Sequence, residues 1–196
     1  QETVVVEHCT ATELRQHFEQ QCNRFLAWAE RQQTHRGVRD DALGSLAFPF
    51  GDFRTGQRPR AHAVYKAAMS QRCLLAQAPT GIGKTMATLF PLLRAVPAKR
   101  LDKVFFLAAK TSGRQPALDA LERIGAGAPN LPLRVLELVA RDKACEHPDK
   151  ACHGDSCPLA KGFYDRLPVA RDAALPRSGG SVTWSQSRVR DVALLH

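Results

Sequence analysis

Apolar side chains recur along the first part of the chain at helical spacing, and the pattern predicts one long helix there. Thr10 and Glu13 form the Ser/Thr-x-x-Glu pattern that caps a helix start, and the apolar positions continue to about Ala29. The polar run 31–41 predicts a fraying end and a linker. The valines at 4–6 predict a short preceding strand. The expected apolar face of the helix comprises Leu14, Phe18, Cys22, Phe25 and Leu26.

From Phe48 onward the pattern changes to short apolar runs that alternate with helical stretches. The predicted strands cover residues 73–76, 104–107 and 134–139, and the predicted helices lie around residues 61–68, 84–95 and 116–124. Pro91 should bend or loosen the second of these helices. Strands alternating with helices predict a parallel sheet with right-handed crossovers, hence an α/β fold.

Beyond residue 139 the composition changes again. Residues 143–161 are rich in Cys, His, Pro, Gly and Lys, which predicts neither a packed helix nor a strand. A Pro/Gly/Ser loop is expected at 176–181 and a helix at 188–196. The three textures suggest three parts: residues 1–47, 48–139 and 140–196. The chain starts at Gln1 and ends within a helical pattern, so we expect it to be a piece of a longer protein.

Charge is distributed unevenly over these parts. The net charge is +9, yet residues 1–47 hold 5 Lys/Arg against 7 Asp/Glu, so the rest of the chain carries +11. A strongly basic region suggests a polyanionic partner such as nucleic acid, with a merely solvated basic surface as the equal alternative. Charged residues interrupt every apolar run before it reaches the roughly 18 residues that span a bilayer, so no membrane segment is expected.

Residues 78–85 carry the most specific motif. They fit the Walker A pattern with Ala in place of the usual first glycine, and they lie between a predicted strand and a predicted helix. Glycines permit backbone N–H groups to converge on phosphate, the lysine reaches the β- and γ-phosphates, and the threonine hydroxyl binds Mg²⁺. The predicted ATP and Mg²⁺ residues are Ala78, Pro79, Thr80, Gly81, Ile82, Gly83, Lys84 and Thr85, with Lys84 and Thr85 in the catalytic roles.

Hydrolysis needs more than this loop. No Asp-Glu pair at the end of an apolar strand follows it, so the second Mg²⁺ ligand and the catalytic carboxylate are not visible in the sequence. We therefore expect ATP binding by this chain, and efficient turnover only in a parent protein.

Three of the six cysteines cluster, and three are scattered. Cys9, Cys22 and Cys73 lie in apolar surroundings and are expected to be buried small hydrophobes. Six residues separate Cys145 from Cys152, and four separate Cys152 from Cys157, with His147 and His153 interspersed. In a reducing cytosol such a cluster predicts metal: Zn²⁺ with a histidine as fourth ligand, or an iron–sulfur cluster with a further cysteine.

Together these features resemble the iron–sulfur DNA helicases of superfamily 2, the XPD and DinG group, and specifically a bacterial DinG-like branch. Phe48-Pro49-Phe50 with Arg54 and Gln57 is similar to the segment before the phosphate loop, and residues 104–114 to motif Ia. Residues 143–148 and Cys157 followed by Phe163-Tyr164 resemble the entry into the cluster domain. Residues 1–40 resemble, more weakly, the stretch after an upstream nuclease module, and a simple brace is the alternative.

The resemblance implies a partial RecA-like ATP-binding domain followed by the start of an iron–sulfur domain. It assigns adenine recognition to Gln57, contact with single-stranded or forked DNA to Lys110, Thr111 and Arg114, and 4Fe-4S ligation to Cys145, Cys152 and Cys157. It implies an ATP-dependent, cytoplasmic DNA helicase with 5′-to-3′ polarity, a role in DNA repair and a monomeric state. The alternatives are a zinc-containing P-loop ATPase that does not unwind DNA and a non-catalytic fragment that binds nucleic acid.

Overall fold

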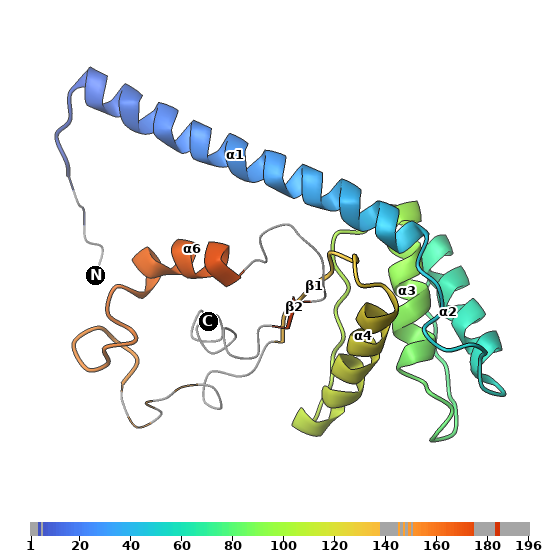
Figure 1. Ribbon diagram of the computed structural model, residues 1–196. Coiled ribbons are helices and arrows are strands. Elements are labelled where there is room, and N and C mark those ends of the chain that lie inside the picture. The colour runs from blue at the N-terminus through green and yellow to red at the C-terminus, as the bar shows by residue number, and fades with distance from the viewer. Residues whose placement is uncertain are drawn as a thin grey trace. The chain divides into compact units, whose positions relative to one another are not determined.

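The computed structural model describes residues 4, 6–137, 145, 147, 149, 151–174 and 183–184 (Figure 1). The chain divides into two compact units, residues 1–38 and 39–196, and each is considered by itself. No helix among the described residues is long and apolar enough to cross a membrane.

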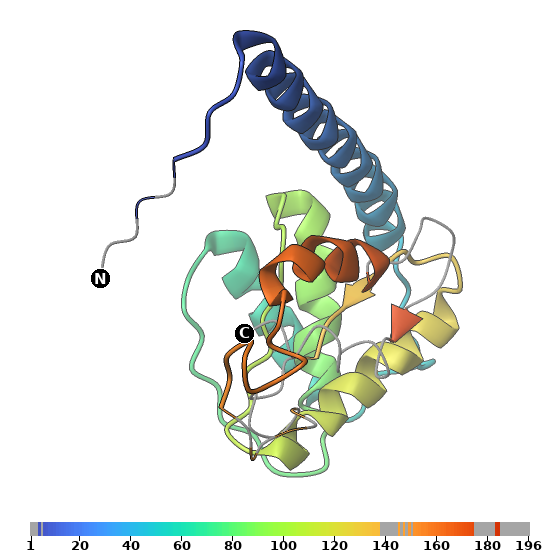
Figure 2. The ribbon, with the colours of Figure 1, turned by 90° about the vertical axis from the view of Figure 1, so that its left-hand side faces the viewer.

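Helix α1, Ala11–Gly44, begins as the sequence predicts. Glu13 Oε2 accepts hydrogen bonds from the Thr10 backbone N–H and hydroxyl, both at 2.8 Å, and Thr10 Oγ1 accepts from the Glu13 N–H at 3.3 Å. The predicted linker at 31–41 is wrong, because α1 continues through it as one helix (Figure 2). This stretch lacks proline, and its three Arg and two Gln residues have good helix propensity, so its polarity alone does not end the helix.

The predicted apolar face of α1 is at the surface in residues 1–38. Leu14, Phe18 and Phe25 are 59%, 66% and 62% exposed. Phe25 packs against Trp28 on the same helix, with ring centroids 5.7 Å apart. Val4 and Val6 are exposed and lie outside any strand.

The three scattered cysteines are not the buried residues that the sequence predicts. Cys9 and Cys73 are exposed, and Cys22 is half-buried. Each one lies on a segment whose apolar neighbours are themselves exposed, so a local apolar context did not produce burial.

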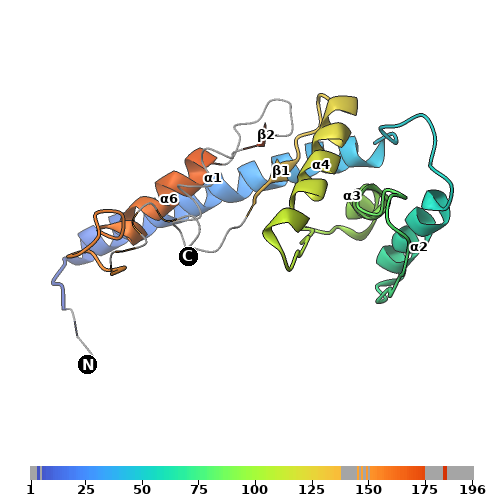
Figure 3. The same cartoon turned by 90° about the horizontal axis from the view of Figure 1, so that it is seen from below.

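Three helices build the centre of residues 39–196, and they lie side by side (Figures 1 and 3). They are α2, Gln57–Ser70, α3, Met86–Lys99, and α4, Gln115–Gly127, the last preceded by a 3-10 turn at Thr111–Gly113. Helix α3 contacts both α2 and α4. All three helices agree with the predicted ones to within a few residues. The core cluster is formed by α3, α4 and the end of α1, and it includes Leu89, Leu93, Val96, Ala120, Ile124 and Leu43. The buried Ala61 and Val64 of α2 lie outside this cluster.

Arg39 joins the last turns of α1 to this core. Its guanidinium is buried and donates to the carbonyl oxygens of Leu101 and Asp102 at 3.0 and 3.1 Å, and it pairs with Asp40 at 2.7 Å. Burial, and then the charge of Arg39, lower the pKa of Arg134.

Helix α3 contains two prolines, Pro91 and Pro97. Helix α3 continues through both prolines, and the bend or loosening predicted at Pro91 stays a prediction. Arg100 closes the helix in a left-handed conformation, φ 50°, where its N–H and that of Leu101 bond to the carbonyls of Pro97 and Val96.

The predicted parallel sheet is largely wrong for the described residues. Residues 73–76 and 104–107 have no strand structure, and Leu75 and Leu107 are 102% and 89% exposed. The third prediction holds in part: β1, Arg134–Val135, pairs in parallel with β2, Thr183–Trp184. A strand depends on hydrogen bonds to a neighbour, so apolar sequence without a paired neighbour remains an extended segment.

The cysteine-rich part forms turns over residues 151–162 and then helix α6, Phe163–Ala174, which the sequence analysis did not predict. Arg166 on α6 donates to the carbonyl oxygens of Leu159 and Lys161 at 2.8 and 2.7 Å. The expected loop at 176–181 and helix at 188–196 lie outside the described residues.

Candidate phosphate-binding site

The predicted phosphate loop forms the turn that leads into α3. Gly81 and Gly83 have φ values of +87° and +76°, a region that residues with a Cβ rarely adopt. At Gly83 a Cβ would also overlap the side-chain nitrogen of Gln57. The two glycines of the motif are therefore required by the conformation, as the sequence predicts.

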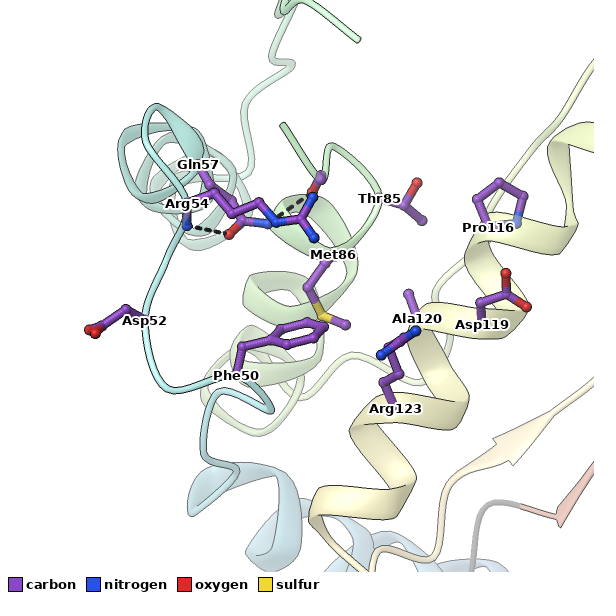
Figure 4. A pocket seen from close by; sticks show the side chains of 11 residues that line it. Phe50, Asp52, Arg54, Gln57, Thr85, Met86, Pro116, Asp119, Ala120 and Arg123 are labelled. Carbon is purple, nitrogen blue, oxygen red and sulfur yellow. Dashed lines mark hydrogen bonds between the residues drawn. The ribbon is translucent and has the colours of Figure 1, made fainter. Parts of the chain in front are cut away.

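Two side chains, Arg54 from the segment before α2 and Gln57 at its first residue, hold this loop (Figure 4). Gln57 is 3% exposed, and its Nε2 donates to the Gly83 carbonyl at 3.2 Å while its Oε1 accepts from the Arg54 N–H at 3.0 Å. The guanidinium of Arg54 donates to the Gly81 carbonyl at 3.1 Å. In this geometry Gln57 positions the loop, a contact that the sequence did not indicate.

Lys84 folds back over the loop. Its ammonium donates to the carbonyl oxygens of Ala78 and Pro79 at 3.2 and 3.1 Å. A phosphate oxygen is a stronger acceptor for an ammonium than a neutral carbonyl oxygen, because the hydrogen bond is then assisted by charge on both sides. The Lys84 ammonium therefore lies at the loop, and the phosphate oxygens of a bound polyphosphate would be better acceptors for it than the two carbonyl oxygens.

Thr85 is the residue before α3 and faces a cavity of about 360 Å³. Three segments line this cavity. They contribute Phe50, Arg54 and Gln57 before and at the start of α2, Thr85 and Met86 at the start of α3, and Asp119 and Arg123 on α4 (Figure 4). The Arg123 guanidinium lies 5.7 Å from the centroid of the Phe50 ring. Sequence reasoning missed Asp119 and Arg123, because they come from a helix that no local motif connects to the loop.

The candidate DNA-contacting residues lie together at the start of α4. Lys110 is exposed, Thr111 begins the 3-10 turn, and Arg114 precedes α4. Arg114 forms an ion pair with Glu137 at 2.7 Å, with both side chains largely buried. A nucleic-acid phosphate would have to compete with that carboxylate for Arg114.

The three candidate metal ligands are not brought together. Cys157 is buried, Cys145 is half-buried and Cys152 is exposed. Among the residues that the structure describes, no group of three or more His, Cys, Asp or Glu side chains could hold a metal ion. The His153 ring instead contacts the Ser156 hydroxyl at 3.0 Å, and the Cys145 sulfur accepts from the His147 N–H at 3.4 Å. As placed, these residues fit neither a 4Fe-4S cluster nor Zn²⁺.

A comparison with known protein families is consistent with the predicted phosphate-binding loop. Residues 58–147 match the DEAD/DEAH box helicase family. The match covers somewhat less than half of the chain and includes the whole phosphate loop and the turn before α4. For this part of the chain it supports a helicase superfamily, with ATP hydrolysis assisted by Mg²⁺ and binding to nucleic acid. The family implies a RecA-like fold, although the described residues are mostly helical and form only the two-stranded sheet β1–β2. No curated protein and no solved structure matches the chain.

Proposed function

We propose that the chain supplies the ATP-binding part of an ATP-dependent DNA helicase. The observation that carries the proposal is the turn before α3, in which Gly81 and Gly83 adopt left-handed φ values next to Lys84 and Thr85. A glycine-rich turn at a helix start directs backbone N–H groups and the positive end of the helix dipole toward an anion.

Lys84 would exchange the carbonyl oxygens of Ala78 and Pro79 for the β- and γ-phosphates of ATP, and the Thr85 hydroxyl would bind Mg²⁺. The metal supplies neutralisation of the charge that develops on the phosphates. Arg54 and Gln57 hold the loop in position. An adenine contact is also proposed for Gln57. Its side-chain amide would then have to hydrogen-bond the base in addition to its present partners, Gly83 and Arg54.

The choice of DNA, the 5′-to-3′ polarity, the cytoplasmic location and the role in repair belong to the proposal through the resemblance to the XPD and DinG group. The charge of +11 outside residues 1–47 supports a polyanionic partner. Lys110, Thr111 and Arg114 are the proposed contacts with single-stranded or forked DNA. The 4Fe-4S cluster is proposed from the spacing of Cys145, Cys152 and Cys157, and no step is assigned to it because the ligands are apart.

The separation of the cysteines favours a second candidate, a P-loop ATPase that binds nucleic acid without an iron–sulfur cluster and does not unwind it. Iron and sulfide in the purified protein would exclude this candidate. Zinc bound in a one-to-one ratio would favour its zinc-containing form.

The ATP site is tested with Lys84→Ala. The substitution removes the ammonium at the loop, so we expect Mg·ATP and Mg·tripolyphosphate to bind at least about tenfold more weakly, a loss of roughly 1.4 kcal/mol or more, in calorimetric titration. Lys66→Ala is the matched control, because Lys66 is an exposed lysine on α2 outside the loop. Equal affinities for the wild type and Lys84→Ala would refute the role of Lys84.

A further inference from the structure

Helix α1 carries a stripe of exposed apolar side chains along residues 14–28 (Figure 1). Leu14, Phe18 and Phe25 keep more than half of their surface, as does Leu26 at 54%, and Trp28 is 40% exposed. Their spacings of three, four, seven and eight residues place them on one side of the helix. A helix normally buries such a stripe, so an exposed one marks a surface that binds another protein segment.

Four charged side chains border the stripe: Glu13, Arg15, Glu30 and Arg31. All four are exposed, and no ion pair among the described residues involves them. At about 100° per residue, the 18 residues from Glu13 to Arg31 make five full turns, so these two charges lie on the same flank. Arg15 and Glu30 are 15 residues apart and lie within about 60° of each other on the other flank. Each flank therefore has opposite charges at the two ends of the stripe.

This order of charges fits a second copy of the same helix that runs in the opposite direction. In a two-fold pair centred at Cys22, each residue faces the one that lies equally far beyond the centre in the other copy. Glu13 and Arg31 are each nine residues from Cys22, and Arg15 and Glu30 are seven and eight residues away, so opposite charges meet on both flanks. A parallel pair in register would place each charge beside its own copy, and like charges repel.

We propose that α1 is a self-association surface, through which two copies of the chain pair antiparallel along residues 14–28 with Cys22 at the two-fold axis. Phe18 of each copy packs on Leu26 of the other, since both lie four residues from the axis. The pairing buries the apolar stripe and sets opposite charges along both of its borders. It is independent of the ATP site, and it replaces the monomeric state that the resemblance implies with a dimer.

Sedimentation equilibrium of the whole chain tests the pairing. The wild type should reach twice the monomer mass of 21.6 kDa as its concentration rises. Phe18→Ser removes an aromatic ring from each half of the interface, so the dissociation constant of the dimer should rise at least about tenfold. Gln16→Ser is the matched control, because Gln16 is exposed on the opposite side of α1 and receives the same new side chain. It should dimerise as the wild type does.

Charge exchange tests the direction of the pair. Arg15→Glu and Glu30→Arg each place like charges opposite one another, so each should weaken the dimer about three- to tenfold at low salt. The double variant restores opposite charges and should return to within about twofold of the wild-type dissociation constant. A parallel pair in register would gain nothing from the double variant. Glu13 is left unchanged because its Oε2 caps the helix start at Thr10.

The proposal is overturned by any of three results. The first is a wild-type mass that stays at 21.6 kDa at the highest concentration, which would assign the stripe to a different partner. The second is a Phe18→Ser variant that dimerises as tightly as the wild type. The third is a double charge variant that is no better than the two single ones, and this result stands even if Phe18→Ser alters folding, since both charged positions are exposed.

Discussion

The phosphate loop and the cysteine-rich segment were both predicted from short sequence patterns, but only the loop adopts the conformation that its motif requires. In the loop, Gly81 and Gly83 turn the chain, and the side chain of Gln57, 26 residues before Gly83, braces it. In the segment 145–174, Cys145, Cys152 and Cys157 differ in burial and do not converge. A contiguous motif carries the glycines that its turn needs, whereas a set of ligands separated by several residues depends entirely on how the intervening chain folds.

The largest expected effect breaks the loop. Gly83→Ala places a Cβ at φ +76° and against Gln57, so we expect backbone strain of about 1–2 kcal/mol with an overpacking cost of similar size, and loss of measurable ATP binding. Gly81→Ala has a similar φ, +87°, but its Cβ would meet nothing within 4 Å. It should therefore cost about 1 kcal/mol and only weaken ATP binding.

Thermal unfolding and ATP titration of the two glycine variants check this ranking. If Gly81→Ala were as damaging as Gly83→Ala, the contact with Gln57 would have no part in forming the loop, and the contrast with the cysteine-rich segment would lose its main support.

The second prediction concerns the cysteines. Cys157 is 4% exposed, so Cys157→Ala should lower the free energy of unfolding by about 1 kcal/mol, whereas Cys152→Ala, at an exposed position, should leave it unchanged. Chemical denaturation measures both values. A shared metal site would make the two substitutions equally harmful and would remove iron or zinc in both, and that result would contradict the arrangement described above.

The smallest effect tests another contiguous motif, the helix start at Thr10 and Glu13. Hydrogen bonds from the Thr10 N–H and then from its hydroxyl lower the pKa of the Glu13 carboxyl below its ordinary value. A lowered acid pKa stabilises the helix start above the unfolded pKa, and this stabilisation is lost as the pH falls through the folded one. In an NMR titration, we expect the chemical shift of the Thr10 amide to change as this hydrogen bond is lost, at a pH below the one at which a glutamate carboxyl ordinarily titrates.

Glu13→Gln is the matched control, because glutamine can still accept the bond in this position but does not titrate. Its Thr10 amide should show no such transition. A transition that persisted in Glu13→Gln would assign the effect to another group.

The sequence predicted those parts of the fold that depend on local chemistry. The cap at Thr10, the helices around Val64, Leu89 and Leu118, and the glycine positions in the loop all follow from residues close to one another in the chain. The wrong predictions concern pairing. The runs around Leu75 and Leu107 have strand-like composition, yet a strand needs hydrogen-bonded neighbours that composition does not supply.

The candidate site divides in the same way. Lys84 and Thr85 could be predicted because the loop motif names them. The positions of Asp119 and Arg123 in the cavity wall and the Arg54–Gly81 hydrogen bond could not be predicted, since each depends on how distant segments pack. The pairing of Arg114 with Glu137 was equally invisible, because its partner lies beyond α4.

Pro91 and Pro97 each remove one backbone hydrogen bond from helix α3. Because proline has no N–H, the carbonyl oxygen of Ala87 lacks the helical donor four residues later. The first turn of α3, which follows Thr85 and the phosphate loop, is therefore tied to the rest of the helix by one hydrogen bond fewer. Packing holds this turn in place, because Met86, Ala87 and Leu89 are buried. A triphosphate bound at the loop would tighten it, and the amide protons of residues 86–90 would then exchange with solvent more slowly.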